Sequence, residues 1–166
     1  MIKIFITQNP VYHNKVKWVL LIISQYTKIP YEFILEKAKS NISIGTSIEN
    51  DIQIDIPFFQ KIENGQTHWK QILPDGPIYK NESGETCILE TIFYLVNCVQ
   101  ELNIDTAETD QWGRFKYTAS LQYHYGIVEQ NFVADLIDQL IERFPILTDG
   151  KGKPSHVSQV FLSHDI

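Results

Sequence analysis

The chain has 166 residues, of which 43% are hydrophobic and 20% are charged, and its formal net charge is −6. A length and composition of this kind suit one compact domain with a real core, and they exclude a disordered tail and a coiled coil. Lysines and arginines are scattered between acids, so the chain has no basic stripe for phosphates and nucleic acid is not an expected partner.

The first third of the chain predicts strands alternating with one helix. A strand is expected over residues 3–6, and Thr-Gln-Asn-Pro then leads into a helix whose apolar residues recur at helical spacing until Pro30. Further strands are expected over residues 31–35, 42–45 and 52–56. This order predicts an α/β fold, with a mostly parallel or mixed sheet flanked by helices in a single compact domain.

The remainder predicts loops and two long helices. Residues 61–84 are rich in Gly, Pro and Asn and predict loops or a hairpin. An apolar stripe predicts a largely buried helix over residues 86–102, and a second amphipathic helix is expected over residues 132–144, ended by Pro145. Between these helices, residues 104–127 are irregular and unusually aromatic.

The two cysteines, Cys87 and Cys98, are expected to be reduced thiols in the core. On one helix their Cα atoms would lie about 16 Å apart, which is too far for a disulfide. Reduced thiols favour a cytoplasmic setting, and residues 1–10 lack the apolar stretch of a signal peptide. The apolar run over residues 19–23 is too short to span a bilayer, so no membrane partner is expected.

The sequence lacks the common patterns of metal sites, serine hydrolases and nucleotide-binding loops. The five histidines never fall three to five residues apart, as ligand pairs on a helix or loop do. The motifs G-x-S-x-G, G-x-x-x-x-G-K-[ST] and G-x-G-x-x-G do not occur. A nucleophilic cysteine would need an exposed cationic setting, whereas both cysteines adjoin apolar residues. We therefore expect neither a metal site nor a cofactor in this chain.

The segment DQWGRFKYTASLQYHYG, residues 110–126, is the least ordinary part of the sequence. Its rings could stack on sugar rings or dock another domain. The candidate binding residues are Trp112, Arg114, Tyr123 and His124. In the alternative interpretation, Trp112, Phe115 and Tyr123 fill the core beneath a long connection. Arg114 would then pair with an acid such as Asp110.

Four short motifs follow one another in the second half of the chain: FYL at residues 93–95, D-x-x-G-R-F at 110–115, S-L-x-Y at 120–123, and Gly126. This order, followed by an amphipathic helix, resembles the N-terminal domain of bacterial (Bacteroidetes-type) polysaccharide deacetylase-like proteins with NodB homology. One departure is clear. Those proteins continue after FYL with a run similar to SRYEEY, whereas this sequence has VNCVQE at residues 96–101.

The last residues, FLSHDI at 161–166, look like the first strand of the deacetylase domain in that family, which ends in T-H-D-[IV]-D. The resemblance implies an N-terminal α/β accessory domain over residues 1–147, a linker over 148–157, and the first strand of a truncated NodB-like domain over 158–166. Asp165 then corresponds to the general base of the family. The metal-binding Asp would be the residue after the last one here.

In that family, a divalent metal held by one Asp and two His polarises the acetyl carbonyl and its attacking water. The resemblance therefore implies a non-catalytic accessory domain that positions or regulates the deacetylase domain of the same polypeptide and contacts polysaccharide. The metal would belong to that missing domain, and this chain alone is expected to be inactive. The alternative is a protein-interaction or regulatory module unrelated to sugar binding.

Overall fold

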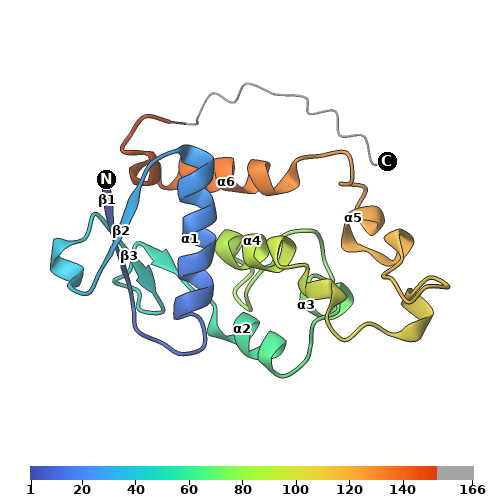
Figure 1. Ribbon diagram of the computed structural model, residues 1–166. Coiled ribbons are helices and arrows are strands. Elements are labelled where there is room, and N and C mark those ends of the chain that lie inside the picture. The colour runs from blue at the N-terminus through green and yellow to red at the C-terminus, as the bar shows by residue number, and fades with distance from the viewer. Residues whose placement is uncertain (153–166) are drawn as a thin grey trace.

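Four parallel strands form one sheet at one end of the computed structural model, which describes residues 1–152 (Figure 1). The strands, in the spatial order β2-β1-β3-β4, are β1 (Ile2–Ile6), β2 (Tyr31–Ile34), β3 (Ile42–Gly45) and β4 (Ile52–Gln53). Ile4 of β1 pairs with Phe33 of β2 on one side and with Ile42 of β3 on the other. The predicted α/β fold, a single compact domain with a parallel sheet flanked by helices, is confirmed.

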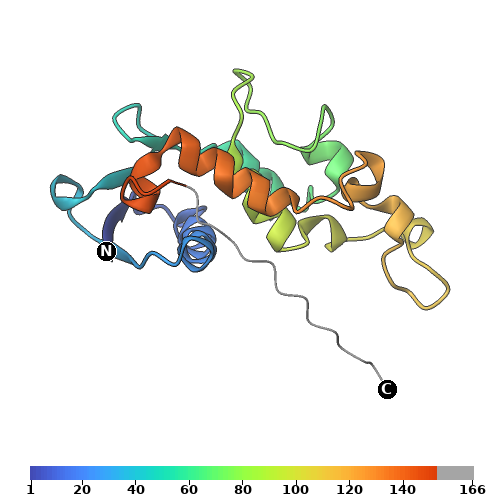
Figure 2. The ribbon, with the colours of Figure 1, turned by 90° about the horizontal axis from the view of Figure 1, so that it is seen from above.

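Helices pack beside the sheet and continue away from it to the other end of the molecule. They are α1 (His13–Thr27), α2 (Ile56–Glu63), α3 (Trp69–Ile72), α4 (Ile88–Val96), α5 (Leu121–His124) and α6 (Phe132–Arg143). Short 3₁₀ turns occupy Lys37–Lys39, Val99–Glu101, Thr106–Glu108, Tyr117–Ala119 and Pro145–Thr148. Helix α4 contacts both α1 and α6, and α6 crosses above it (Figure 2). The core therefore lies around α4.

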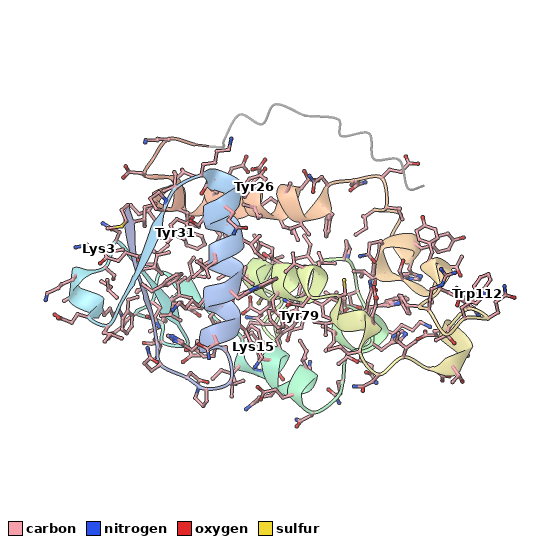
Figure 3. The ribbon with its side chains drawn as sticks, in the orientation of Figure 1. Lys3, Lys15, Tyr26, Tyr31, Tyr79 and Trp112 are labelled. Carbon is pink, nitrogen blue, oxygen red and sulfur yellow. The ribbon has the colours of Figure 1, made fainter. Side chains whose placement is uncertain are left out.

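The pattern of β1 shows why the helices gather on one face. Ile2, Ile4 and Ile6 alternate along the strand and are at most 2% exposed, because successive strand residues point to opposite faces. Lys3, between them, is exposed and is labelled at the sheet end in Figure 3. The sheet thus has one apolar face buried under helices and one face with polar residues.

The helix predicted over residues 86–102 is shorter in the structure. Helix α4 ends at Val96, and Cys98 takes a left-handed conformation with φ of 49° before a 3₁₀ turn begins. The Asn97 side chain donates to the Phe93 carbonyl at 2.8 Å, a local bond that competes with further helix. Both cysteines are free thiols, but the core position predicted for both is right only for Cys87, since Cys98 is exposed.

Two other predictions need correction. The alternation over residues 52–56 makes only the short strand β4, because the Asp55 carboxylate accepts from the Phe58 amide at 3.1 Å and caps α2. The predicted loop or hairpin of residues 61–84 contains the last part of α2 and the one-turn helix α3. The ring of His68 caps α3 by accepting from the Lys70 amide at 3.1 Å.

The described part of the chain ends shortly after α6. As predicted, α6 stops before Pro145, and the following turn packs onto β2, where the Tyr31 hydroxyl donates to the Leu147 carbonyl at 2.9 Å. The predicted terminal strand, Asp165 and the linker from residue 153 onward lie outside the described residues. Within the described part, no helix is both long and apolar enough to cross a membrane.

Candidate functional site

The aromatic segment over residues 104–127 forms the end of the molecule opposite the sheet. Figure 3 shows Trp112 at that end, far from Lys3 and Tyr31 of the sheet. The segment contains α5 and two 3₁₀ turns, and the rest is irregular. Its shape therefore depends on specific side-chain bonds rather than on long regular elements.

A tight hairpin holds Trp112 away from the core. The Asp110 carboxylate Oδ1 accepts from the backbone amides of Trp112 at 2.9 Å and of Arg114 at 3.0 Å. The Gly113 amide donates to the Asp110 carbonyl, and Gly113 has a φ of 77°, a left-handed value that favours glycine. Thr109 and Phe115 form an antiparallel bridge that closes the hairpin. The indole is thus placed near the tip of a braced turn.

The guanidinium of Arg114 contacts both the Asp110 carboxylate and the Trp112 ring. It lies 2.8 Å from Asp110 Oδ2, and its Cζ lies 4.8 Å from the centroid of the Trp112 ring. The predicted pairing of Arg114 with Asp110 is confirmed. The backbone hydrogen bond from Arg114 is the main cause that lowers the pKa of Asp110 below its usual value.

Tyr117 and Tyr123 form a second aromatic pair beside the hairpin. Their ring centroids are 5.2 Å apart, with an edge-to-face angle of 71°. The hydroxyl of Ser120 accepts from the Tyr123 amide at 3.1 Å and donates to the Tyr117 carbonyl at 2.7 Å. Ser120 therefore caps α5 and fixes the backbone that carries both rings.

These rings are largely exposed to solvent. The exposed fractions are 69% for Trp112, 56% for Tyr117 and 52% for Tyr123. The alternative that Trp112 and Tyr123 fill the core is therefore wrong, because the hairpin and α5 carry them outward, whereas Phe115 is half-buried. We call the set Trp112, Arg114, Tyr117 and Tyr123 the aromatic surface.

Two shallow hollows of about 420 and 480 Å³ adjoin the aromatic surface. Arg114, Phe115 and Tyr117 line both of them. Two side-chain amides also line the first hollow, where Gln100 Nε2 donates to Gln122 Oε1 at 2.8 Å. A ligand in this place would meet rings on one side and polar groups on the other, a combination suited to a molecule with apolar faces and hydroxyl edges.

His124 packs against Trp69 and Tyr125 and is not part of the aromatic surface. Its ring lies tilted by 34° against the Trp69 ring with a centroid distance of 4.3 Å, and it contacts Tyr125 edge to face at 4.8 Å. Trp69 is 5% exposed, and its indole donates to the Ala119 carbonyl at 2.9 Å. The structure thus brings Trp112 and Arg114 together and places Tyr123 beside Tyr117. His124 instead packs over the buried Trp69 ring.

The sequence places Tyr117 among the rings of the aromatic segment, but it is not one of the four candidate binding residues. Tyr117 is as exposed as Tyr123, and the Ser120 cap inside the S-L-x-Y motif is the signal that favours Tyr117 as a fifth candidate. The pair of Gln100 and Gln122 had no such signal. It depends on the 3₁₀ turn after α4 meeting α5 in space.

Residues 1–152 do not fit a catalytic metal. Within them, no three side chains of His, Cys, Asp or Glu converge to hold an ion. His68 Nε2 and Glu108 Oε1 lie 2.7 Å apart, but this pair is needed to hold α3 against the turn at Thr106–Glu108. We assign no catalytic step to these residues, and the candidate base Asp165 lies outside the described part.

A family model described as a family of unknown function (DUF7033) matches residues 4–145. No curated protein and no solved structure matches the chain. The matched range includes the hairpin and α5, so the aromatic surface lies within the part of the chain that the family model covers.

Proposed function

We propose a function for this chain, which belongs to the DUF7033 family of unknown function: it is a non-catalytic accessory domain that contacts polysaccharide through the aromatic surface. In this proposal it positions or regulates a deacetylase domain of the same polypeptide, in a cytoplasmic setting. The sugar contact is proposed because Trp112, Tyr117 and Tyr123 are exposed on a backbone that side-chain hydrogen bonds hold in place. The deacetylase partner rests on the resemblance of the sequence motifs.

The chemistry of the aromatic surface supports a sugar ligand. The apolar face of a sugar ring packs on an aromatic ring, and its hydroxyls need donors and acceptors at the edge. The guanidinium of Arg114, held by Asp110, and the amide of Gln122 supply such groups next to the rings. Because the hairpin and the α5 cap fix the backbone that carries these side chains, binding would require little ordering of the backbone.

The proposed role is positional. The rings would hold a polysaccharide near the deacetylase domain, whose own residues and divalent metal would carry out the hydrolysis. This chain alone is then expected to release no acetate from acetylated sugars. Metal-dependent acetate release by the purified chain would contradict a non-catalytic role.

An array of acetylated polysaccharides tests the sugar contact. The purified chain is expected to bind at least one of them, and Trp112→Ala is expected to weaken that binding about tenfold, which corresponds to 1.4 kcal/mol. Trp18→Ala is the matched control, since Trp18 is a 41% exposed tryptophan on α1. No retained sugar, or equal losses in the two variants, would refute the proposed contact.

A protein partner is the second candidate for the same surface. Trp, Tyr and Arg are the residues that most often dominate protein interfaces, and here Arg114 lies over the Trp112 ring and lines the same two hollows as Tyr117. Affinity purification from cells would then recover a protein partner that depends on Trp112, with no sugar retained on the array. Sugar binding without such a partner would favour the accessory-domain function.

A further inference from the structure

A separate cavity of about 260 Å³ lies between the β4 end of the sheet and the helices α4 and α6. Its walls include residues 51–55, the first turn of α4 and the last turn of α6. It shares no lining residue with the two hollows beside the aromatic surface. The charged residues that line it are Asp51, Asp55, Glu85, Glu90 and Arg143.

Glu90 is the most unusual group in this cavity. The residue is 1% exposed, yet its carboxylate forms no salt bridge within the described residues. The Asp55 amide donates to Glu90 Oε1 at 2.8 Å, and backbone hydrogen bonds from Asp55 and from Glu90 itself partly compensate the burial of the carboxylate. A buried carboxylate of this kind is unfavourable without further compensation. Burial accordingly raises the pKa of Glu90 to about 7.

Asp55 adds a further carboxylate, and so more negative charge, to the cavity. Its Oδ2 is held by the Tyr79 hydroxyl at 2.7 Å and by the Phe58 amide at 3.1 Å, so the carboxylate cannot turn away freely. Its charge is one of the causes that raise the pKa of Glu90. Four acids thus face one cation, Arg143, whose guanidinium lies over the Phe144 ring at 5.4 Å. The cavity carries an excess of negative charge.

We infer that this cavity binds a small molecule bearing an ammonium group, which lies against the Glu90 carboxylate and supplies a counter-charge for this buried acid. The volume of about 260 Å³ is close to the lower end of ligand pockets and suits one small ring rather than a polymer. An ammonium group fits better than a metal ion, because no three ligating side chains converge within residues 1–152. This inference does not depend on the proposed polysaccharide contact.

Glu90 also has a structural role, since it ties the Asp55 amide to α4. The variant Glu90→Gln separates the two roles, because the glutamine oxygen can still accept from that amide while the charge is gone. The matched control is Glu129→Gln, an exposed residue outside the cavity. Both variants are expected to keep the circular dichroism spectrum of the unmodified chain.

Calorimetry with a matched pair of probes tests the inference at about pH 8, above the raised pKa of Glu90. The probes are trans-4-aminocyclohexanol, which carries the ammonium group, and the neutral cyclohexane-1,4-diol. The amine is expected to bind at millimolar or lower concentration and the diol is not. Glu90→Gln should weaken amine binding at least about tenfold, while Glu129→Gln leaves it unchanged. Equal binding of both probes, no binding of the amine, or an unaltered affinity in Glu90→Gln would overturn the inference.

Cys87 provides a second readout because it lines the same cavity, where burial and the charge of Glu90 raise the pKa of its thiol to about 12 and make it slow to react. In a Cys98→Ser background, which removes the exposed thiol, alkylation of Cys87 can be followed by mass spectrometry. The bound amine should slow this alkylation several-fold, and the slowing should disappear when Glu90→Gln is added. Slowing that persists in Glu90→Gln would show that the amine does not bind through this carboxylate.

Discussion

The aromatic residues of the core and those of the aromatic surface are similar in type but opposite in environment. Phe58, Phe59 and Tyr94 are at most 1% exposed, and the rings of Phe58 and Phe59 pack edge to face at 5.0 Å. Trp112 and Tyr123 are 69% and 52% exposed. The comparison teaches that ring content alone does not distinguish a core from a binding surface; the backbone that carries the rings does.

The two regions also differ in what holds the backbone. The core rings lie on α2 and α4, whose periodicity turns one side of each helix inward. The exposed rings lie on a hairpin and a one-turn helix that depend on Asp110 and Ser120. Substitutions should therefore affect global stability in the core and ligand binding in the aromatic surface.

The largest expected effect is the loss of a core ring. Phe58→Ala removes a ring that is 0% exposed and leaves a cavity between Phe59 and Tyr79, so we expect the free energy of unfolding to fall by about 3–5 kcal/mol. Urea unfolding followed by circular dichroism measures it. A loss below about 1 kcal/mol would mean that the core around α2 is not packed as described.

The next effect concerns the buried carboxyl of Glu90 and its dependence on pH. Its pKa is raised from 4.5 to about 7, so between these values the folded chain binds more protons than the unfolded chain. The contribution of Glu90 is thus most favourable below its unfolded pKa, and it is lost as pH rises through the folded pKa. Relative to Glu90→Gln, the unmodified chain should lose roughly 3 kcal/mol across this window. Parallel stability profiles of the two proteins would contradict the raised pKa.

A smaller effect is expected at the close approach of β3 to the turn after β1. A Cβ on Gly45 would overlap the side chains of Thr7 and Asn50, so Gly45→Ala should cost about 1–3 kcal/mol. Adding Thr7→Ala should recover part of that loss, because it removes one of the overlapping side chains. The double-mutant cycle is measured by urea unfolding, and strictly additive losses would argue against this contact.

The smallest effect is expected at the aromatic surface. Trp112→Ala removes a ring that is 69% exposed, so the free energy of unfolding should change by no more than about 0.5 kcal/mol. Thermal and urea unfolding beside Phe58→Ala give the comparison directly. A loss as large as that of the core variant would make Trp112 a structural residue and remove the contrast between the two regions.

Some elements could be predicted from the sequence because local patterns decide them. Strands β1 to β3 follow from short apolar runs between turns, and the end of α6 follows from Pro145. The Arg114 pair with Asp110 lies four residues apart, within reach of a tight turn. These features depend on residues that are close together in the sequence, so they can be recognised from it.

Other features depend on the folded backbone or on a distant partner, and the sequence patterns did not predict them. The apolar stripe continued past Val96, but Asn97 and the left-handed Cys98 end α4 there. Glu90 stood inside an apolar helix, and nothing nearby indicated that its carboxylate meets the Asp55 amide. The direction of the Trp112 ring likewise depends on the bonds of Asp110 within the folded hairpin.

The most direct test of the aromatic surface uses the indole signals of the three tryptophans in a nitrogen-15 NMR spectrum. Trp112 lies in the aromatic surface, Trp69 is buried with its indole bonded to Ala119, and Trp18 is exposed on α1. Titration with fragments of acetylated polysaccharide is expected to shift the Trp112 indole signal and to leave those of Trp69 and Trp18 in place. An unmoved Trp112 signal at saturating sugar, or a shift confined to Trp18, would contradict the proposed contact.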